Sequence, residues 1–307
     1  MLQKFIVLLS GLMLVISLSA CGESTPVNCI DGFHEEDGKC VEDDPVCYAP
    51  SDYSDQLTYE LVFEDEFDGT EVNEDIWNFE LFGGGGNNEI VLYTEDNHTV
   101  ADGFLTITAR QEQVNDWEYT STRMTTKGNA QWKYGIIEVR AMLPDALGTW
   151  PAIWMLPGQN NYGIWPNSGE IDIMEHVGYD LNTIHGTIHT RIYNHKDGSQ
   201  KGGSIDDYTD VTTAFHTYSI EWLPDRIIFQ MDGEDYYTYN ATKFSSCPTY
   251  NVWPFNEEFY LILNVAVGGD WGGANGVDPN DYPTDMVIDY VRVYQATELI
   301  GYDDHTD

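Results

Sequence analysis

The 307-residue sequence has very few basic residues: 13 lysines and arginines stand against 52 aspartates and glutamates, a formal charge of −39. Such a chain repels polyanions, so nucleic acids, polyphosphates and heavily sulfated polymers are not expected as partners. The charge is interpreted as surface solvation and does not argue against an uncharged partner. Helical periodicity is nearly absent as well, and only "DIWNF" and "DVTTAFH" each predict about one helical turn.

The amino terminus carries a short apolar run, residues 5–18, which follows Lys4. At about 14 residues it is short for a membrane span and typical of an export signal. It ends in "LSAC", which resembles the lipobox of bacterial lipoproteins, so residues 1–21 are predicted to be a lipoprotein signal peptide with Cys21 lipidated. A plain secretory signal is the alternative. Several acyl chains on Cys21 would hold the protein stably in the bacterial cell envelope, at the outer membrane or cell surface.

Cysteine is scarce, because only four residues of this type follow Cys21. An even number in an exported protein suggests disulfide bonds. Cys29 and Cys40 enclose the compact segment "CIDGFHEEDGKC" and are expected to pair. A zinc site is disfavoured because the spacing has no CxxC knuckle. Cys47 and Cys247 either pair with each other or stay free.

The composition changes along the chain at about residue 57. Residues 22–56 hold ten acidic residues and one lysine, which predicts an acidic spacer around the small disulfide loop. Residues 57–296 contain short β-type runs separated by Gly and Pro turns, and residues 297–307 form an acidic tail. This pattern predicts one all-β domain, a sandwich or barrel. The strands are expected at 103–110, 134–143, 170–177, 182–190, 216–223, 227–232, 235–239, 259–267 and 286–295, with a hairpin turn at Asp232-Gly233.

The segment "SGEIDIMEHVG" has an irregular spacing of carboxylates. In a regular strand Glu170 and Asp172 share one face, but Glu175 falls on the opposite, buried face. Because an unpaired buried carboxylate is very costly, that geometry is rejected. A β-bulge at Ile173-Met174 returns Glu175 to the face of the other two. The spacing therefore predicts a bulged strand with three carboxylates in a row.

Three carboxylates in a row repel one another, which separates their pKa values. One then stays ionised as a nucleophile while another keeps a proton as an acid, the requirement of a retaining glycosidase. The alternative is a solvated strand face in an acidic protein. The surroundings favour catalysis, since tryptophans and glycine-rich turns flank the row in "GTWPAIWMLP", "YGIWPNSGE" and "VGGDWGG". Tryptophan rings bind the apolar faces of sugars, although core packing is the usual fate of any one of them.

These segments closely resemble glycoside hydrolase family 16, and within it the bacterial laminarinases, which are endo-β-1,3-glucanases. The family's ExDxxE pattern is matched by residues 170–175, and the resemblance covers about residues 60–295. The matching segments occur in the family's order: "LVFEDEFDG", "GNNEIVLYT", "TSTRMTTKG", "YGIIEVRAMLP", "WPAIWMLP", "GEIDIMEHVG", "HGTIHT", "FHTYSIEW", "ILNVAVGGDWGG" and "IDYVRVYQ".

The resemblance implies a jelly-roll β-sandwich of two curved antiparallel sheets with a concave substrate cleft. It implies Glu170 as nucleophile and Glu175 as general acid/base, with Asp172 between them tuning the nucleophile. His189 matches a position that faces this row. Sugar-binding positions of the family match Asn88, Arg123, Trp150, Trp154, Trp165 and Trp271, each of which has packing or loop stabilisation as its alternative role.

The resemblance also implies a structural calcium ion on the convex face, with Glu66, the carbonyl of Gly103 and Asp289 as the matching ligands. No cofactor is required for the chemistry. The expected activity is retaining, endo-acting hydrolysis of β-1,3-glucan by a monomer whose polysaccharide substrate is its partner. The alternatives are mixed-linkage β-1,3-1,4-glucan, an agar- or carrageenan-type galactan, or a β-glucan-binding protein without catalysis.

Overall fold

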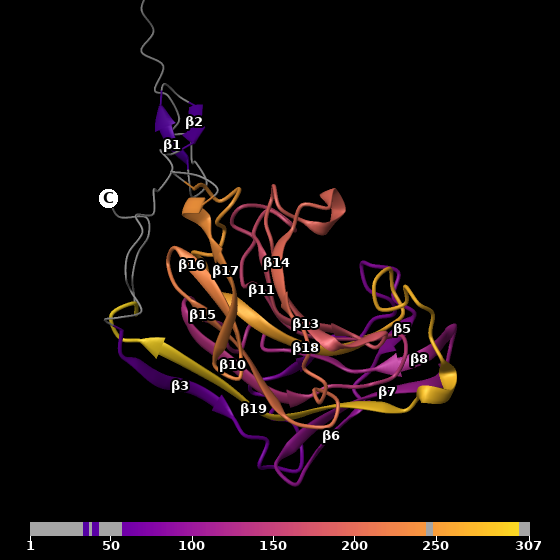
Figure 1. Cartoon of the computed structure of the whole chain (residues 1–307). Coiled ribbons are helices and arrows are strands. Elements are labelled where there is room, and N and C mark those ends of the chain that lie inside the picture. Colours follow the sequence, from indigo (N-terminus) through magenta and orange to yellow (C-terminus); the bar gives the residue numbers. More distant parts are fainter. Residues whose placement is uncertain (1–32, 37–38, 43–56, 244–247, 301–307) are drawn as a thin grey trace, which may run out of the picture. The chain divides into compact units, whose positions relative to one another are not determined.

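The computed structural model describes residues 33–36, 39–42, 57–243 and 248–300 (Figure 1). The predicted signal peptide with Cys21, the Cys29 end of the predicted disulfide, and Cys47 and Cys247 lie outside these residues. Within the described part, no helix has the length and hydrophobicity that crossing a bilayer demands.

The chain divides into two units, Met1–Asp44 and Pro45–Asp307. In the first, strands β1 (Phe33–Glu36) and β2 (Lys39–Glu42) form an antiparallel hairpin that pairs Glu35 with Cys40. The hairpin lies inside the predicted acidic spacer, whose boundaries, like those of the signal peptide and the tail, stay predictions.

The second unit contains two sheets, drawn as two curved layers in Figure 1. One described sheet has ten strands in the order β17-β16-β15-β10-β19-β7-β8-β5, with β3 beside β19 and β6 beside β7. Its strands are β3 (Tyr59–Asp65), β5 (Val91–Tyr93), β6 (His98–Ala101), β7 (Phe104–Val114), β8 (Trp117–Ser121), β10 (Gly135–Met142), β15 (His216–Trp222), β16 (Arg226–Met231), β17 (Glu234–Asn240) and β19 (Thr284–Ala296).

The other described sheet has seven strands in the order β14-β13-β12-β11-β18-β9-β4. Its strands are β4 (Asn78–Phe79), β9 (Arg123–Thr125), β11 (Thr149–Pro157), β12 (Glu170–Val177), β13 (Asp180–His189), β14 (Lys201–Ile205) and β18 (Phe259–Val267). Helical structure among the described residues amounts to three 3-10 turns, η2 (His195–Asp197), η3 (Ala241–Lys243) and η4 (Pro279–Asp281). The predicted all-β sandwich is confirmed, with one departure: β5 pairs with β8 in parallel.

The hydrophobic core lies between the sheets because inward positions alternate along the strands. In β10 every second residue is buried, from Gly135 onward. β18 is buried along its whole length: its alternate positions, among them Leu261 and Leu263, join the core, whereas Asn264 and Ala266 line a cleft on the other face. The seven-stranded sheet therefore has a core face and a cleft face.

The predicted bulge is present in β12. The register against β13 shifts between Asp172 and Glu175, and the register against β11 passes from Met174 directly to Asp172, which leaves Ile173 as the extra residue. Ile173 and Met174 are both buried in the core. Because two consecutive residues take core positions, Glu175 returns to the face that carries Glu170 and Asp172. The bulge that was predicted from the cost of burying an unpaired carboxylate is confirmed.

The two segments expected to form helical turns each form a single hydrogen-bonded turn. The amide of Trp77 donates to the carbonyl of Asn73, and that of Ala214 to Asp210. The hairpin turn predicted at Asp232-Gly233 connects β16 and β17, and both residues have positive φ, 51° and 79°, as a type I′ turn requires.

The carboxyl end of β12 is fixed by a close approach of the backbone at Gly178. A Cβ built on Gly178 would lie 1.9 Å from the carbonyl oxygen of Ala146 and 2.8 Å from the hydroxyl of Thr149. We expect Gly178→Ala to lower the free energy of unfolding by about 2 kcal/mol or more, because backbone must move to admit the methyl group. Urea unfolding measures this. Gly69→Ala is the control, since its nearest neighbour would be 3.4 Å away, and an equal effect of both substitutions would contradict the explanation.

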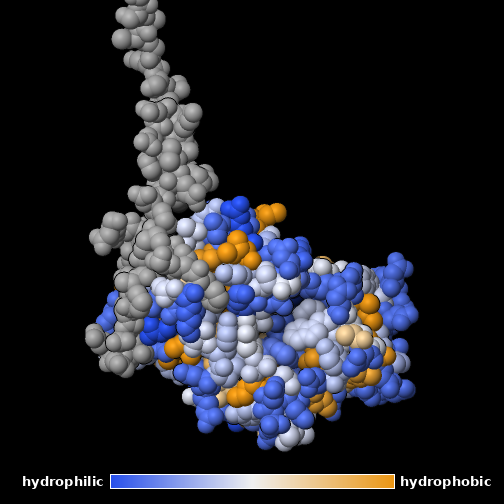
Figure 2. All heavy atoms as spheres, turned by 45° about the horizontal axis from the view of Figure 1, so that its top comes forward, coloured by the Kyte–Doolittle hydropathy of each residue, from blue (hydrophilic) through white to orange (hydrophobic). Residues whose placement is uncertain are grey.

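The surface is largely hydrophilic on the face that Figure 2 shows, and hydrophobic residues appear there as small separate patches.

Candidate active site

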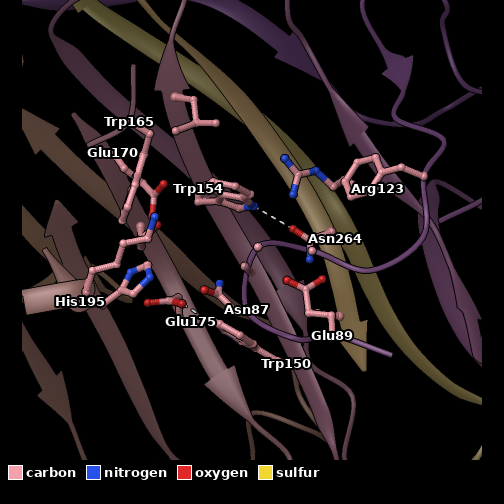
Figure 3. Close-up of a pocket in the computed structure, with 18 residues that line it drawn as sticks. Asn87, Glu89, Arg123, Trp150, Trp154, Trp165, Glu170, Glu175, His195 and Asn264 are labelled. Carbon is pink, nitrogen blue, oxygen red and sulfur yellow. Dashed lines mark hydrogen bonds between the residues drawn. The ribbon is translucent and has the colours of Figure 1, made fainter. Parts of the chain in front are cut away.

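A cleft of about 370 Å³ opens on the face of the seven-stranded sheet away from the core. It is formed by β9, β11, β12 and β18, by the glycine-rich segment before β5, and by η2 (Figure 3). Its lining residues are Phe82, Gly85, Gly86, Asn87, Glu89, Arg123, Trp150, Ala152, Trp154, Leu156, Trp165, Glu170, Asp172, Glu175, His195, Lys196, Asn264 and Ala266.

The three carboxylates of β12 all line this cleft, and His189 of β13 lies beside them. Glu170 is paired with His189 in the register of the two strands. The Nε2 atom of His189 lies 3.2 Å from Oδ2 of Asp172 and 3.6 Å from Oε1 of Glu170. Asp172 and His189 are almost completely buried, at 4% and 5% exposure, while Glu170 and Glu175 are partly accessible. The row thus places its two glutamates toward a substrate and its aspartate beneath them.

Burial raises the pKa of all three carboxyl groups to about 8. These values include a rise from the charge of Asp172 at Glu170 and Glu175, which His189 opposes at both. Such coupled groups lose their protons one after another, so the row retains at least one proton at neutral pH. The arrangement can therefore supply an ionised carboxylate and a carboxylic acid at the same time.

The tryptophans of β11 are oriented by hydrogen bonds. The indole N–H of Trp150 donates to Oε1 of Glu175 at 3.0 Å, and that of Trp154 donates to Oδ1 of Asn264 at 2.7 Å (Figure 3). The guanidinium of Arg123 lies over the Trp154 ring, 4.7 Å from its centroid. These contacts fix two half-buried indole rings along the floor of the cleft, where they can stack against sugar rings.

A second group of side chains forms the side of the cleft next to Glu170. Trp165, which precedes β12, lies 5.9 Å from His189 and 5.0 Å from His195 between ring centroids. The ammonium of Lys196 lies 4.7 Å from the Trp165 ring centroid. Trp165 and His195 lie beside Glu170 in Figure 3, facing the wall that carries Arg123 and Asn264. The side of the cleft next to the carboxylates is therefore aromatic and carries a cation.

Two residues predicted to contact substrate, Asn88 and Trp271, have other positions, while His189 faces the carboxylate row as the resemblance implies. Asn88 has a positive φ of 61°, which directs its amide to Oδ1 of Asp270 at 2.9 Å, and the neighbouring Asn87 lines the cleft in its place. Trp271 packs edge-on against Trp150, with 5.5 Å between ring centroids, and is not among the residues that line this cleft. His189 is covered by the carboxylate row. Of the predicted sugar contacts, Arg123, Trp150, Trp154 and Trp165 line the cleft.

Two of the three residues predicted to bind calcium, Glu66 and Asp289, are engaged in ion pairs. The carboxylate of Glu66 accepts two hydrogen bonds from Arg292, at 2.6 and 2.9 Å, and that of Asp289 pairs with Arg140. In this arrangement a guanidinium group pairs with each of the two carboxylates, and calcium binding by this set of residues stays a prediction. Near the cleft, ligand atoms of Glu170, Asp172 and His189 lie within 4.8 Å of one another, which is close enough for a cation. The same proximity also lets these groups share a proton.

Several lining residues were not singled out from the sequence. Asn264 had a signal, because it is the one strongly polar residue in the apolar run "FYLILNVAV". Glu89 lies within the segment "GNNEIVLYT", but no role was assigned to it. Phe82 lies in a loop, and His195 and Lys196 lie in the short turn η2, so none of the three carried a periodic signal.

A β-sandwich whose bulged strand lines an aromatic cleft with three coupled carboxylates defines a glycoside hydrolase of the two-carboxylate type. The chain belongs to glycosyl hydrolases family 16, whose family model matches residues 86–292. It is 47% identical over 257 residues to a β-glucanase of Rhodothermus marinus, covering 81% of this chain and 90% of the relative.

Two solved structures extend the comparison. The X-ray structure of the laminarinase from Rhodothermus marinus superposes with a TM-score of 0.76 at 46% identity, covering 79% of this chain and 99% of the relative. A non-specific endo-β-1,3(4)-glucanase of family GH16 has a TM-score of 0.71 at 40% identity, covering 81% and 94%. The identification of the family from the sequence is confirmed, and the chain is a glycoside hydrolase.

Proposed function

We propose that this enzyme is a retaining endo-β-1,3-glucanase that acts on laminarin-type glucan. The observation that carries the proposal is the row of Glu170, Asp172 and Glu175 on one face of a bulged strand, in a cleft open to solvent and lined by indole rings. Support for the substrate comes from the relatives described as a β-glucanase and a laminarinase. The predicted lipid on Cys21 would hold the enzyme at the cell envelope, where external polysaccharide is accessible.

In the proposed mechanism, the protonated carboxyl of Glu175 donates its proton to the glycosidic oxygen while the carboxylate of Glu170 attacks the anomeric carbon. The glycosidic bond breaks, and a covalent glycosyl ester forms on Glu170. Glu175, now ionised, removes a proton from water, which displaces Glu170 and releases a sugar of unchanged anomeric configuration. Asp172, buried beside Glu170 and His189, influences the pKa of the nucleophile through its charge. No cofactor takes part in these steps.

The proposal is tested by measuring reducing-sugar release from laminarin, lichenan, agarose and κ-carrageenan, with NMR of the fresh laminarin products. We expect strong release from laminarin, with β-configured reducing ends appearing before mutarotation. Products that first appear in the α configuration would overturn the double displacement. Release from agarose alone would contradict the proposed substrate and would leave the proposed mechanism unchanged.

Mixed-linkage β-1,3-1,4-glucan is the second candidate substrate. It is favoured by the 40% identity to a solved enzyme that is described as non-specific for 1,3 and 1,4 linkages. Hydrolysis of lichenan with a kcat/KM similar to that for laminarin would establish this broader activity. A laminarin preference of a hundredfold or more would exclude it.

A further inference from the structure

The wall of the cleft opposite Trp165 carries a carboxylate, Glu89, that takes no part in the proposed mechanism. Glu89 lies just before β5, is half-buried, and lines the cleft together with Asn264 and Arg123 (Figure 3). Its backbone is anchored by a bridge to Gly268. Burial raises the pKa of Glu89, and its hydrogen bond with Tyr93 and the charge of Arg123 act in the opposite direction.

Tyr93 holds this carboxylate from below. The Tyr93 side chain is 1% exposed, and its hydroxyl donates to Oε2 of Glu89 at 2.8 Å. The same hydroxyl accepts a hydrogen bond from the amide of Asn264 at 3.4 Å, and Asn264 in turn accepts from Trp154 at 2.7 Å. A phenol has one proton to donate and can accept at the same time, so Tyr93 occupies the centre of a continuous chain from Glu89 to Trp154.

The loop that contains Gly85 lies directly against the carboxylate of Glu89. A Cβ built on Gly85 would lie 1.9 Å from Oε1 and 2.5 Å from Oε2 of Glu89, so the backbone at this position passes directly over the carboxylate. Glu89 is thus confined by Gly85 above and Tyr93 below. With Oε2 bonded to Tyr93, Oε1 remains as the hydrogen-bond acceptor nearest the loop.

The positive charge on this wall is already neutralised. The guanidinium of Arg123 pairs with Oε2 of Glu80 at 2.6 Å and stacks on Trp154. The other cation of the cleft, Lys196, lies with Trp165 on the opposite side. An incoming sugar therefore meets a carboxylate acceptor at Glu89, which suits neutral hydroxyl groups and repels carboxylate or sulfate substituents.

We propose that Glu89 selects for neutral sugars by accepting a hydroxyl hydrogen bond from the glucan, and that Tyr93 is the positioning residue that holds it for this contact. The inference rests on the proposed hydrolysis of β-1,3-glucan. It adds to that function a selection against anionic chains, which acts within the cleft and not only through the charge of the whole surface.

The test compares Glu89→Gln, Tyr93→Phe and the double variant with the full wild-type chain on two substrates, neutral β-1,3-glucan and the same glucan carboxymethylated. We expect Glu89→Gln to lower kcat/KM for the neutral glucan about tenfold, mainly through KM, because the contact is made equally in ground and transition states. The ratio of activity on carboxymethylated to neutral glucan should rise about tenfold or more. Tyr93→Phe should raise KM for neutral glucan severalfold alone and have little further effect in the double variant.

Tyr239→Phe is the matched control, because Tyr239 lies in β17 of the ten-stranded sheet and its buried hydroxyl donates to the carbonyl of Val252, outside the cleft lining. It should lower stability without changing the substrate ratio. An active wild type whose ratio is unchanged in Glu89→Gln would overturn the inference and leave the proposed function. Additive effects of the two substitutions would overturn the positioning role of Tyr93. A wild type inactive on both glucans would overturn the proposed function and this inference with it.

Discussion

Replacing Glu170 by alanine is expected to lower the rate of β-1,3-glucan hydrolysis by roughly 10⁴-fold or more, the scale at which removal of a nucleophile acts in covalent catalysis. The substitution removes the atom that forms the glycosyl ester, and no neighbour can replace it. Asp172 is covered, with 4% exposure, and Glu175 lies beyond the bulge and accepts a hydrogen bond from Trp150. Hydrolysis should be followed by reducing-sugar release from laminarin.

Added azide distinguishes the role of Glu170 from a general loss of structure. With the nucleophile deleted, azide can enter the vacated space and attack the anomeric carbon of an activated aryl glycoside, which gives an α-glycosyl azide. Stability should not fall, because the variant loses a carboxyl group whose pKa burial raises to about 8. A β-glycosyl azide from Glu170→Ala would reassign Glu170 as the acid/base and contradict the proposed roles. Circular dichroism and thermal unfolding provide the control for folding.

The catalytic strand is the part of the site that the sequence predicted best. Strand alternation and the cost of burying a charge leave one geometry for the spacing of Glu170 and Glu175, and the shift of register in β12 confirms it. Trp150 and Trp154 are four residues apart, so the same alternation puts them on one face of β11, and both line the cleft. These features depend on residues within one strand, so local periodicity is sufficient to find them.

Residues that reach the cleft from loops could not be placed in this way. Asn87 and Asn88 are adjacent and chemically identical, and the positive φ of Asn88 decides which of them faces the cleft. Trp271 was expected in a subsite, yet it packs edge-on against Trp150 and does not line this cleft, because the neighbours of a ring depend on how distant segments of the chain fold together. Glu89 and Asn264 are 175 residues apart and meet only through Tyr93. Sequence spacing carries no information on such contacts.

The short strands at the sheet edges were also hard to predict. β4 has two residues and β5 has three, too few for a period of two to be visible. β5 pairs with β8 in parallel, which requires a long connection, here through β6 and β7. Long core strands such as β18, by contrast, are continuous apolar runs whose ends the sequence marks clearly.

Replacing Glu175 by glutamine is expected to slow laminarin hydrolysis by about 10²- to 10⁴-fold, the usual contribution of a positioned acid. A natural glucan needs a proton on its leaving oxygen, whereas an aryl glycoside with an acidic phenol does not. The variant should therefore retain most of its rate in forming the glycosyl enzyme from the aryl substrate, which is measured as a burst of phenol. Added azide should give a β-glycosyl azide, the opposite outcome to that of Glu170→Ala.

The pH profile gives an independent signature of this acid. Burial and the charge of Asp172 raise the pKa of Glu175 to about 8, so the wild type should lose kcat/KM on laminarin as pH rises through about 8. Below that pH Glu175 keeps its proton, and because the three carboxyl groups titrate as one coupled set, the first proton that the row loses ionises Glu170 and sets the acidic limit. In Glu175→Gln the alkaline decline should disappear when the burst on the aryl substrate is followed. An unchanged alkaline limb would assign the proton to another group.

Because the pKa of Glu175 is raised in the folded state, its contribution to stability should fall as pH rises. In the unfolded chain a glutamate titrates near 4.5, whereas in the folded state the pKa of Glu175 is about 8. Between these values the folded state binds more protons, so the contribution of Glu175 to stability is fully present below about 4.5 and is lost as pH rises through 8. Glutamine carries no charge to desolvate, and Glu175→Gln should raise the melting temperature at pH 9 by several degrees while changing it little at pH 4. An equal shift at both pH values would show that altered packing, and not the removed charge, accounts for the gain.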